Sequence, residues 1–476
     1  MMAAHLPPSA RAYAATVALR LRQAAGAALL AVTALSHSGA QAQSTSFVLP
    51  AQGCAMAHCD ARMSNTVGVP SPRQGREVSV DRSSAGAVGG LGCVSNGRYA
   101  ACTGSSDPSL KSNLSFYDAD GNLLWDDGGL LDATAWYSAA MISDTHQVIA
   151  ADQKRLLRAD PLNGRIVWQS AKLDDGTPIS PVLVGANAAI VLLATKSDAG
   201  VGSPELSTWD LETGALLSHA GLLDPATGVR YQTINTPAVR GNRAYVLAAA
   251  VGTPDDGRLY ALDVCESEAC GGRGTFTVAW FFPFSGPSSA SPLLIGSRIF
   301  FDGLRGRTTG LYFGVDDLGT SAAQVWKRSY GSRFGFNAAQ DPRGGLWISP
   351  WQSGTLLRVA EADGSTLQTV DVSVASGLGS GYSPVTAVSV SRTSAGAVVL
   401  TNGIQTKSST TATAPYVVAL DVSSTDAGAS LWKYKVSTNA LRNAPTGQYP
   451  VVTNAAGSRR VVFRGTTSGT FFIGEP

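Results

Sequence analysis

Short apolar runs separated by turn residues dominate the chain. Residues 158–170 read "RADPLNGRIVWQS", in which a turn containing Asp160 and Gly164 separates two short runs, the second ending near Trp168. An Asp side chain bonds backbone N–H groups in a turn, and Gly adopts positive φ without steric cost. Runs this short, bounded by turn residues, are typical of strands rather than helices. The stretch therefore predicts a β-hairpin.

The same strand–turn–strand pattern recurs along the chain. An acidic residue opens each turn, and a Trp closes the second strand in most copies; the acidic residues are Asp118, Asp160, Asp210, Asp263, Asp317, Glu361 and Asp421. They recur about every 40–60 residues, a period typical of solenoids and propellers. The Trp residues are Trp125, Trp168, Trp280, Trp326 and Trp432, while Ser218 and Gln368 stand at this position in the other copies.

A second pattern marks another strand in each repeat. Pro stands among small residues at the start of strands predicted at 179–185, 235–241, 290–296, 382–388 and 449–454. Pro lacks the N–H donor of a central strand, so it suits the start of an edge strand, and small side chains suit a crowded axis. A further apolar run lies between each such strand and the next acidic turn. Each repeat therefore predicts four strands.

These repeats predict an all-β fold, an eight-bladed β-propeller of four-stranded antiparallel blades. A single four-stranded sheet does not bury both of its faces, whereas blades arranged radially cover one another. Each Trp, with about 200 Å² of surface, is expected to dock its blade on the next one. Seven repeats carry the turn, and three strands follow Asp421. We expect residues 76–83 to supply the missing fourth strand and close the last blade.

The first 42 residues have the pattern of a secretory signal peptide. Arg11, Arg20 and Arg22 precede an apolar run at 24–35, and Ala40-Gln41-Ala42 resembles a cleavage site. Removal of residues 1–42 takes away three Arg and no acid, so the formal charge of +2 becomes −1. The mature protein is therefore expected to be periplasmic or extracellular, without a transmembrane segment and without a nucleic-acid partner.

All six Cys residues lie beyond this signal. Export makes disulfides plausible, and the pairs nearest in sequence are Cys54 with Cys59, Cys93 with Cys102, and Cys265 with Cys270, although six Cys permit fifteen pairings. Residues 43–75 predict an irregular arm containing the first pair, with His58 as a loop residue. The Cys and His spacings match neither covalent haem attachment nor a metal site, so no metal is predicted.

The repeat resembles that of the PQQ-like eight-bladed propellers over residues 76–476. The resemblance rests on strands that end in "YALD" and "VVALD" and on turns followed by "GNLLW" and "GRIVW". It implies the fold of a group that includes quinoprotein alcohol dehydrogenases and a non-enzymatic propeller of outer-membrane assembly. The dehydrogenases bind PQQ with a disulfide between adjacent Cys and bind Ca²⁺ with acidic residues and Asn. This chain has no Cys-Cys dipeptide and no matching ligand positions.

No catalytic residue and no cofactor are predicted. The chain lacks a Gly-x-Ser-x-Gly elbow, a His-Glu-x-x-His motif and a P-loop. We therefore expect a non-catalytic binding or assembly scaffold, monomeric, with a protein or glycan partner. Two alternatives stay open: a dehydrogenase with a divergent site for PQQ and Ca²⁺, and a glycan-binding propeller.

The predicted contact surface lies where the chain passes from the fourth to the sixth repeat. Arg and aromatic residues on one rim are typical of binding surfaces. The candidates are Phe282, Phe284, Arg328, Tyr330, Arg333, Phe334, Phe336 and Trp351. The alternative is that these aromatic side chains pack between blades and under long loops.

Overall fold

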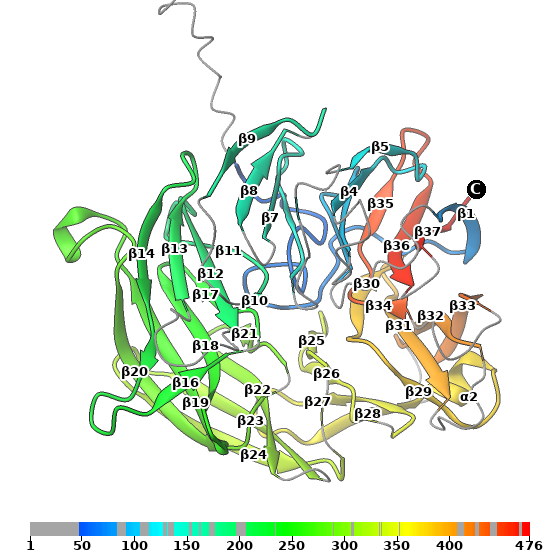
Figure 1. Ribbon diagram of the computed structural model, residues 1–476. Coiled ribbons are helices and arrows are strands. Elements are labelled where there is room, and N and C mark those ends of the chain that lie inside the picture. The colour runs from blue at the N-terminus through cyan, green and yellow to red at the C-terminus, as the bar shows by residue number, and fades with distance from the viewer. Residues whose placement is uncertain are drawn as a thin grey trace, which may run out of the picture. The chain divides into compact units, whose positions relative to one another are not determined.

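The computed structural model contains eight antiparallel β-sheets arranged in a ring, as the repeats predicted (Figure 1). The structure describes residues 47–82, 92–104, 114–126, 131, 138–151, 155–160, 163–170, 177–196, 206–233, 235–288, 290–305, 309–332, 334, 336–351, 353–406, 414–423, 428–437, 445–465 and 469–476. The first strands of each blade are buried and the last is largely exposed, so the chain runs from the axis outward in every blade.

The first four blades follow one another in chain order. Blade 1 contains β2 (Cys93–Ser95), β3 (Ala100–Thr103), β4 (Leu114–Tyr117) and β5 (Leu123–Asp126), and blade 2 contains β6 (Met141–Ile142), β7 (Val148–Ala151), β8 (Leu156–Ala159) and β9 (Ile166–Gln169). Blade 3 contains β10 (Thr177–Pro178), β11 (Val182–Val184), β12 (Ile190–Lys196), β13 (Leu206–Asp210) and β14 (Leu216–Ala220). Blade 4 is the largest, with β15 (Leu222–Leu223), β16 (Arg230–Gln232), β17 (Ala238–Arg240), β18 (Arg243–Ala250), β19 (Thr253–Val264) and β20 (Phe276–Ser285).

The remaining blades complete the ring. Blade 5 contains β21 (Leu293–Ile295), β22 (Arg298–Arg305), β23 (Thr309–Asp317) and β24 (Ala322–Ser329), and blade 6 contains β25 (Ala339–Gln340), β26 (Leu346–Ile348), β27 (Thr355–Val359) and β28 (Thr366–Asp371). Blade 7 contains β29 (Tyr382–Pro384), β30 (Ser389–Arg392), β31 (Val398–Thr406), β32 (Tyr416–Asp421) and β33 (Ala429–Lys435). In the described part of the chain, two short helices interrupt this pattern, η1 (Glu268–Cys270) and α2 (Val372–Ser376).

Blade 8 joins the two ends of the described chain. Its innermost position is shared by β34 (Pro445–Thr446) and β35 (Val451–Thr453), which both pair with β36 (Arg459–Gly465). β37 (Gly469–Gly474) follows, and β1 (Arg76–Asp81) is the outermost strand. β1 pairs with β37 in antiparallel register, from Arg76 opposite Gly474 to Asp81 opposite Thr470. The prediction that an N-terminal strand closes the eighth blade is therefore confirmed.

The five Trp residues of the repeat lie on the fourth strands of their blades and reach the neighbouring blade. The indole N–H of Trp168 donates to the carbonyl of Leu211, and that of Trp326 donates to the carbonyl of Glu361. Trp280 donates to the side chain of Asp317, and Trp432 to the carbonyl of Pro72. Trp125 lies against Gly164 of the next blade. The indoles of the first four Trp residues therefore fill the space between two blades, whereas the indole of Trp432 packs against residues 72–75, which lead into β1 of blade 8.

Blades without this Trp use other contacts. The side-chain amide of Gln368 donates to the carbonyl of Val422. Val422 follows Asp421 as Leu211 follows Asp210, so Gln368 bonds the same position of the next blade as Trp168 does. In blade 6 the Gly364 N–H bonds the carbonyl of Ala360, so Ala360 and not Glu361 opens the turn. The prediction for that blade was therefore wrong by one residue, because the acidic residue there lies one position later.

An insertion in blade 4 stabilises the contact between blades 3 and 4, where Ser218 replaces the Trp of most other repeats. The insertion follows β19 and is closed by the Cys265–Cys270 disulfide. Its Arg273 forms an ion pair with Asp210 of blade 3, and its Gly274 carbonyl accepts a hydrogen bond from Thr208. The insertion therefore bridges blades 3 and 4.

The close approach of Trp to Gly makes a direct test of blade docking. Gly214 and Gly228 both have φ of 69°, so Ala at either position has the same backbone strain. A Cβ atom on Gly214 would lie 2.4 Å from the Trp168 ring, whereas one on Gly228 would meet no atom within 4 Å. We expect Gly214→Ala to lower the free energy of unfolding by about 2 kcal/mol more than Gly228→Ala. Urea unfolding of both variants measures the difference, and equal losses would contradict the docking role.

Residues 47–75, part of the predicted irregular arm, lie largely inside the ring of blades (Figure 1). Their backbone bonds the innermost strands or the turns that follow them. Blades 1, 2, 4, 5, 6 and 7 are reached through Cys54–Ser95, Ala55–Ile142, Ala61–Val239, Arg62–Leu294, Ser64–Gln340 and Val67–Val390. The Gln448 side chain of blade 8 bonds the backbone of Met56 and His58. We call residues 47–75 the plug.

The central part of the plug is as buried as the core of the blades. Met56, Ala57, Met63 and Asn65 have no exposed surface, and His58 is only 4% exposed. His58 contacts Asn65, with 3.3 Å between Nδ1 and Oδ1, and Asn65 donates to the carbonyl of Ala338. The interpretation of His58 as a loop residue was therefore incomplete, because its side chain belongs to the centre of the molecule.

All six Cys residues form disulfides, and the pairs are the ones nearest in sequence: Cys54–Cys59, Cys93–Cys102 and Cys265–Cys270. The first lies in the plug, the second joins β2 to β3, and the third closes the insertion of blade 4. In the described part of the chain, no helix combines the length and the hydrophobicity that a membrane span requires.

Candidate functional site

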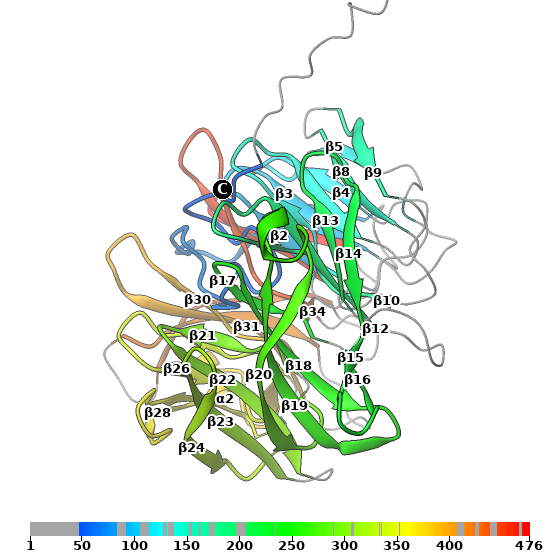
Figure 2. The ribbon, with the colours of Figure 1, turned by 90° about the vertical axis from the view of Figure 1, so that its left-hand side faces the viewer.

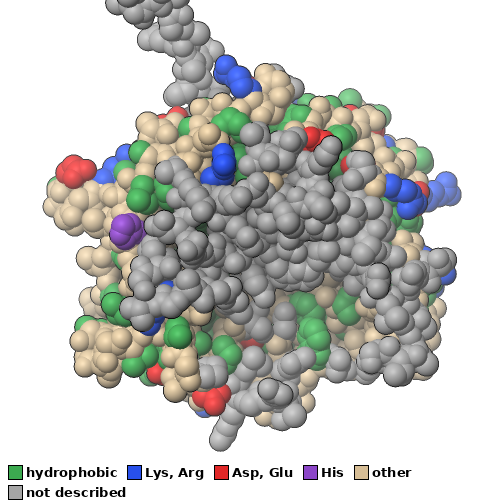
Figure 3. Space-filling view, viewed as in Figure 1, with side chains coloured by type: hydrophobic (Ala, Val, Ile, Leu, Met, Phe, Trp, Pro, Cys, Tyr) green, Lys and Arg blue, Asp and Glu red, His purple; other side chains and the backbone are tan. Residues whose placement is uncertain are grey.

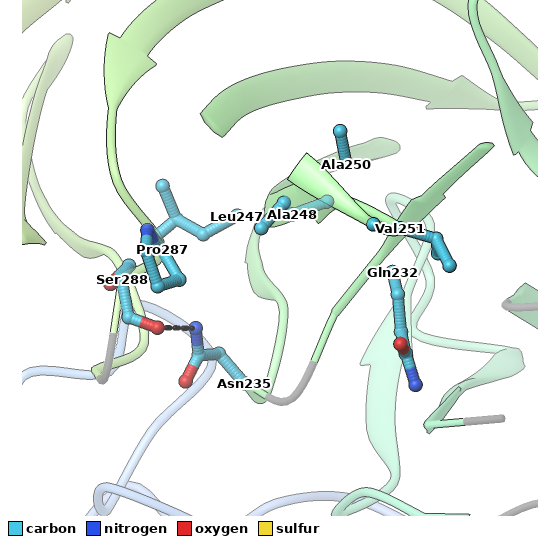
Figure 4. A pocket seen from close by; sticks show the side chains of 10 residues that line it. Gln232, Asn235, Leu247, Ala248, Ala250, Val251, Pro287 and Ser288 are labelled. Carbon is cyan, nitrogen blue, oxygen red and sulfur yellow. Dashed lines mark hydrogen bonds between the residues drawn. The ribbon is translucent and has the colours of Figure 1, made fainter. Parts of the chain in front are cut away.

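A hollow of about 320 Å³ opens on the inner strands of blade 4, beside the join to blade 5 (Figure 4). Its walls come from the end of β16, the C-terminal half of β18 and the segment after β20. The lining residues are Gln232, Asn235, Leu247, Ala248, Ala249, Ala250, Val251, Gly252, Pro287 and Ser288. β16 and β17 both pair with β18, but the residues between these two strands, around Asn235, do not. The hollow lies where this pairing is interrupted.

Three uncharged polar side chains are set in this otherwise apolar lining. The Asn235 side chain donates to the carbonyl of Ser288 across 3.3 Å, which joins the two sides of the hollow (Figure 4). The Ser288 hydroxyl donates to the buried carboxylate of Asp302 and also lies within hydrogen-bond distance of the carbonyl of Ala290. Gln232 is the third polar group. None of the lining residues is ionisable, so this hollow suits an uncharged ligand with both polar and apolar surface.

A second hollow, of about 480 Å³, lies beside α2. Its lining is mostly Gly and Ser, and its carboxylate, Asp371, caps α2 by accepting from the backbone N–H groups of Ser373 and Val374. Apolar side chains line much of the hollow in blade 4, which we therefore regard as the stronger candidate.

Two aromatic residues of the predicted rim pack between blades. Phe284 is buried and Phe282 half-buried, and both contact the rings of Phe301 and Phe313 in blade 5. Pro287 and Ser288, three and four residues after Phe284, line the hollow. The join that sequence reasoning selected therefore reaches the hollow, but through other residues.

The other rim candidates fall into two groups. Phe334 is buried against Tyr312 and Tyr330, while Arg328 and Tyr330 donate to the carbonyls of Asp363 and Gly364 in blade 6. Phe336 and Trp351 form a stacked, half-buried pair with ring centroids 5.3 Å apart. Arg333 lies outside the described residues. Interblade packing thus accounts for most of these side chains and leaves Phe336 and Trp351 as the accessible part.

Charged groups between blades 4 and 5 form a network with a structural role. Asp317 accepts hydrogen bonds from Tyr245, Trp280 and Arg243. Burial alone would raise the pKa of Asp317, but these bonds, the Gly319 N–H and the charge of Arg243 lower it to about 2. Asp317 therefore stays ionised and holds the two blades together.

The described residues contain no group of three or more His, Cys, Asp or Glu side chains that could hold a metal ion. The plug lies against the innermost strands, and none of the residues that line the hollow in blade 4 is charged. On the face in Figure 3, the coloured Lys and Arg side chains are scattered singly and form no extensive basic patch.

Comparison with known proteins supports the fold and does not identify a family. No protein-family model and no curated protein matches the sequence. Among solved structures, the chain is similar to the quinohemoprotein alcohol dehydrogenase from Comamonas testosteroni, with 12% identity, a TM-score of 0.61, and coverage of 89% of this chain and 81% of that one. It is also similar to a europium-containing methanol dehydrogenase, with 11% identity, a TM-score of 0.56, and coverage of 87% and 90%.

A third similar structure is BamB from Moraxella catarrhalis, with 12% identity, a TM-score of 0.49, and coverage of 84% of this chain and 97% of that one. At these identities the likeness concerns the fold alone. The predicted eight-bladed propeller architecture is therefore confirmed.

Proposed function

We propose that the mature chain is an exported, non-catalytic scaffold that binds a protein partner through the hollow in blade 4. The observation that carries this proposal is the lining of that hollow, which is apolar with three uncharged polar side chains and contains no acid, base or metal ligand. Catalysis of proton or group transfer needs a titratable or nucleophilic group next to the substrate. Binding needs shape and a few fixed hydrogen-bonding groups, which this lining supplies.

Export is supported by the pairing of every Cys in the chain. Three disulfides persist in an oxidising compartment and are rare in reducing ones. The predicted signal in residues 1–42 agrees with this location.

The proposal is tested by recovering partners from an envelope extract with the immobilised mature protein. Val251 lines the hollow and is 54% exposed, so Val251→Arg blocks the hollow at little cost to the fold. Val374, which is 71% exposed beside the second hollow, gives the matched control Val374→Arg. We expect a partner that the wild type and the Val374→Arg variant recover and that the Val251→Arg variant loses.

Two results would contradict the proposal. One is equal recovery by the two Arg variants, which would place the partner elsewhere. The other is dye-linked alcohol oxidation after incubation with PQQ and Ca²⁺, which would favour the dehydrogenase alternative. If the wild type binds a glycan on an array and Val251→Arg abolishes this binding, the ligand of the hollow is a saccharide rather than a protein.

A further inference from the structure

The outer edge of blade 4 differs from the other outer edges of the ring. β20 forms this edge and, with ten residues, is the longest of the fourth strands (Figure 2). A strand at the edge of a sheet leaves one row of backbone N–H and C=O groups unpaired, which is a template for another strand. Among the described residues, only β19 pairs with β20.

Charge protects the other long outer edges but not this one. Charged side chains on edge strands are a common means of preventing further pairing. β24 carries Lys327 and Arg328, β33 carries two Lys, β28 ends at an Asp, and β1 carries three charged residues. β20 reads "FTVAWFFPFS" and has no charged residue. Pro283, which lacks an N–H group, interrupts this edge near its C-terminal end, so the part from Phe276 to Phe282 is the part that is open to an uncharged strand.

Apolar side chains of β20 are exposed and held in place. Val278 is 55% exposed and Phe281 is 44% exposed. The Phe281 ring lies 4.2 Å from the guanidinium of Arg258, whose other side lies 4.3 Å from the ring of Tyr231. Arg258 is fixed in turn by an ion pair with Asp224. Because Phe281 is already ordered, a partner that covers it loses little side-chain entropy on binding.

We propose that β20 accepts an extended segment of a partner protein as an added β-strand. The segment would be uncharged, with β-branched or aromatic residues at alternate positions to cover Val278 and Phe281. A second copy of this chain is the weaker candidate, because pairing of a single strand buries less than the roughly 1,200 Å² at which stable interfaces between folded proteins begin. Val278 and Phe281 do not line the hollow, so this surface does not depend on the proposed function.

The test uses the full mature protein and a library of phage-displayed random peptides. Enriched peptides are expected to be uncharged with alternating apolar residues, and to bind the Val278→Lys variant at least about tenfold more weakly. The matched control is Val325→Lys on β24, because Val325 is 40% exposed on the outer strand of the next blade. That variant and Val251→Arg are expected to bind the peptides like the wild type.

A second measurement does not depend on the variants. Peptide addition to the wild type is expected to slow hydrogen exchange of the β20 amides and not of the β24 amides. Charged peptides, equal binding to the Val278→Lys variant, or unchanged exchange in β20 would overturn the proposal. A concentration-dependent dimer in sedimentation that Val278→Lys abolishes would also overturn it, since the occupant would then be a second copy.

Discussion

Replacement of both Cys54 and Cys59 by Ser is expected to lower the free energy of unfolding by about 5 kcal/mol, against about 2 kcal/mol for Cys265 and Cys270. Both disulfides have a sequence separation of 5, so their loss frees the unfolded chain by the same amount. The difference comes from the folded state. Cys54 has no exposed surface and Cys59 only 4%, whereas Cys270 is exposed.

Two new hydroxyl groups in the plug have no room to reach water. A buried polar group without a partner costs about 1–3 kcal/mol, and two of them account for the expected difference. The plug also bonds seven of the eight blades, so its loosening affects the whole ring. Urea unfolding of the two double variants measures both losses, each after oxidative refolding. If the two losses are equal, the plug contributes no more than a surface loop.

The propeller could be predicted because its contacts repeat. Asp and Gly set the same turn in successive blades, and Trp168 and Trp326 make the same bond to the next blade. A signal that recurs at a regular period stands out even when single copies are altered, as with Gln368. The closing strand β1 could be predicted from the same regularity, since the last repeat lacked a fourth strand.

The plug could not be predicted because nothing in it repeats. Its bonds to the blades are mostly backbone bonds, such as Ala55 with Ile142 and Arg62 with Leu294, and side-chain identity carries little signal for them. Its apolar residues follow no strand or helix period. Residues such as His58, Met63 and Asn65 adopt positive φ, which only the surrounding ring stabilises.

The hollow was missed for a related reason. Aromatic and Arg residues attract attention in a sequence, but Phe284 and Phe334 satisfy the packing between blades. Gln232 and Asn235 have no distinctive chemistry, and the segment containing Asn235 was interpreted only as the start of an inner strand. What makes them line a hollow is the departure of the chain from β18, a tertiary feature without a sequence pattern.

The plug also makes the molecule sensitive to mild acid. Burial lowers the pKa of His58 from 6.5 to about 4, and the contact with Asn65 offsets this only in part. In the unfolded chain His58 has its ordinary pKa of about 6.5, so the unfolded state binds this proton first as the pH falls. The contribution of neutral His58 is therefore complete above pH 6.5 and is lost progressively down to pH 4, by about 3 kcal/mol.

The variant His58→Asn separates this effect from the titration of carboxylates. Asn tolerates the positive φ of 56° at this position and has no titrating group. It is expected to be less stable than the wild type at pH 7 and to lose less stability between pH 7 and pH 4, so the two curves converge in acid. His219→Asn, on the exposed side of β14, is the control and is expected to follow the wild type. Parallel curves for the wild type and His58→Asn would show that His58 takes up its proton in the folded plug, and acid sensitivity would then have to be assigned to other groups.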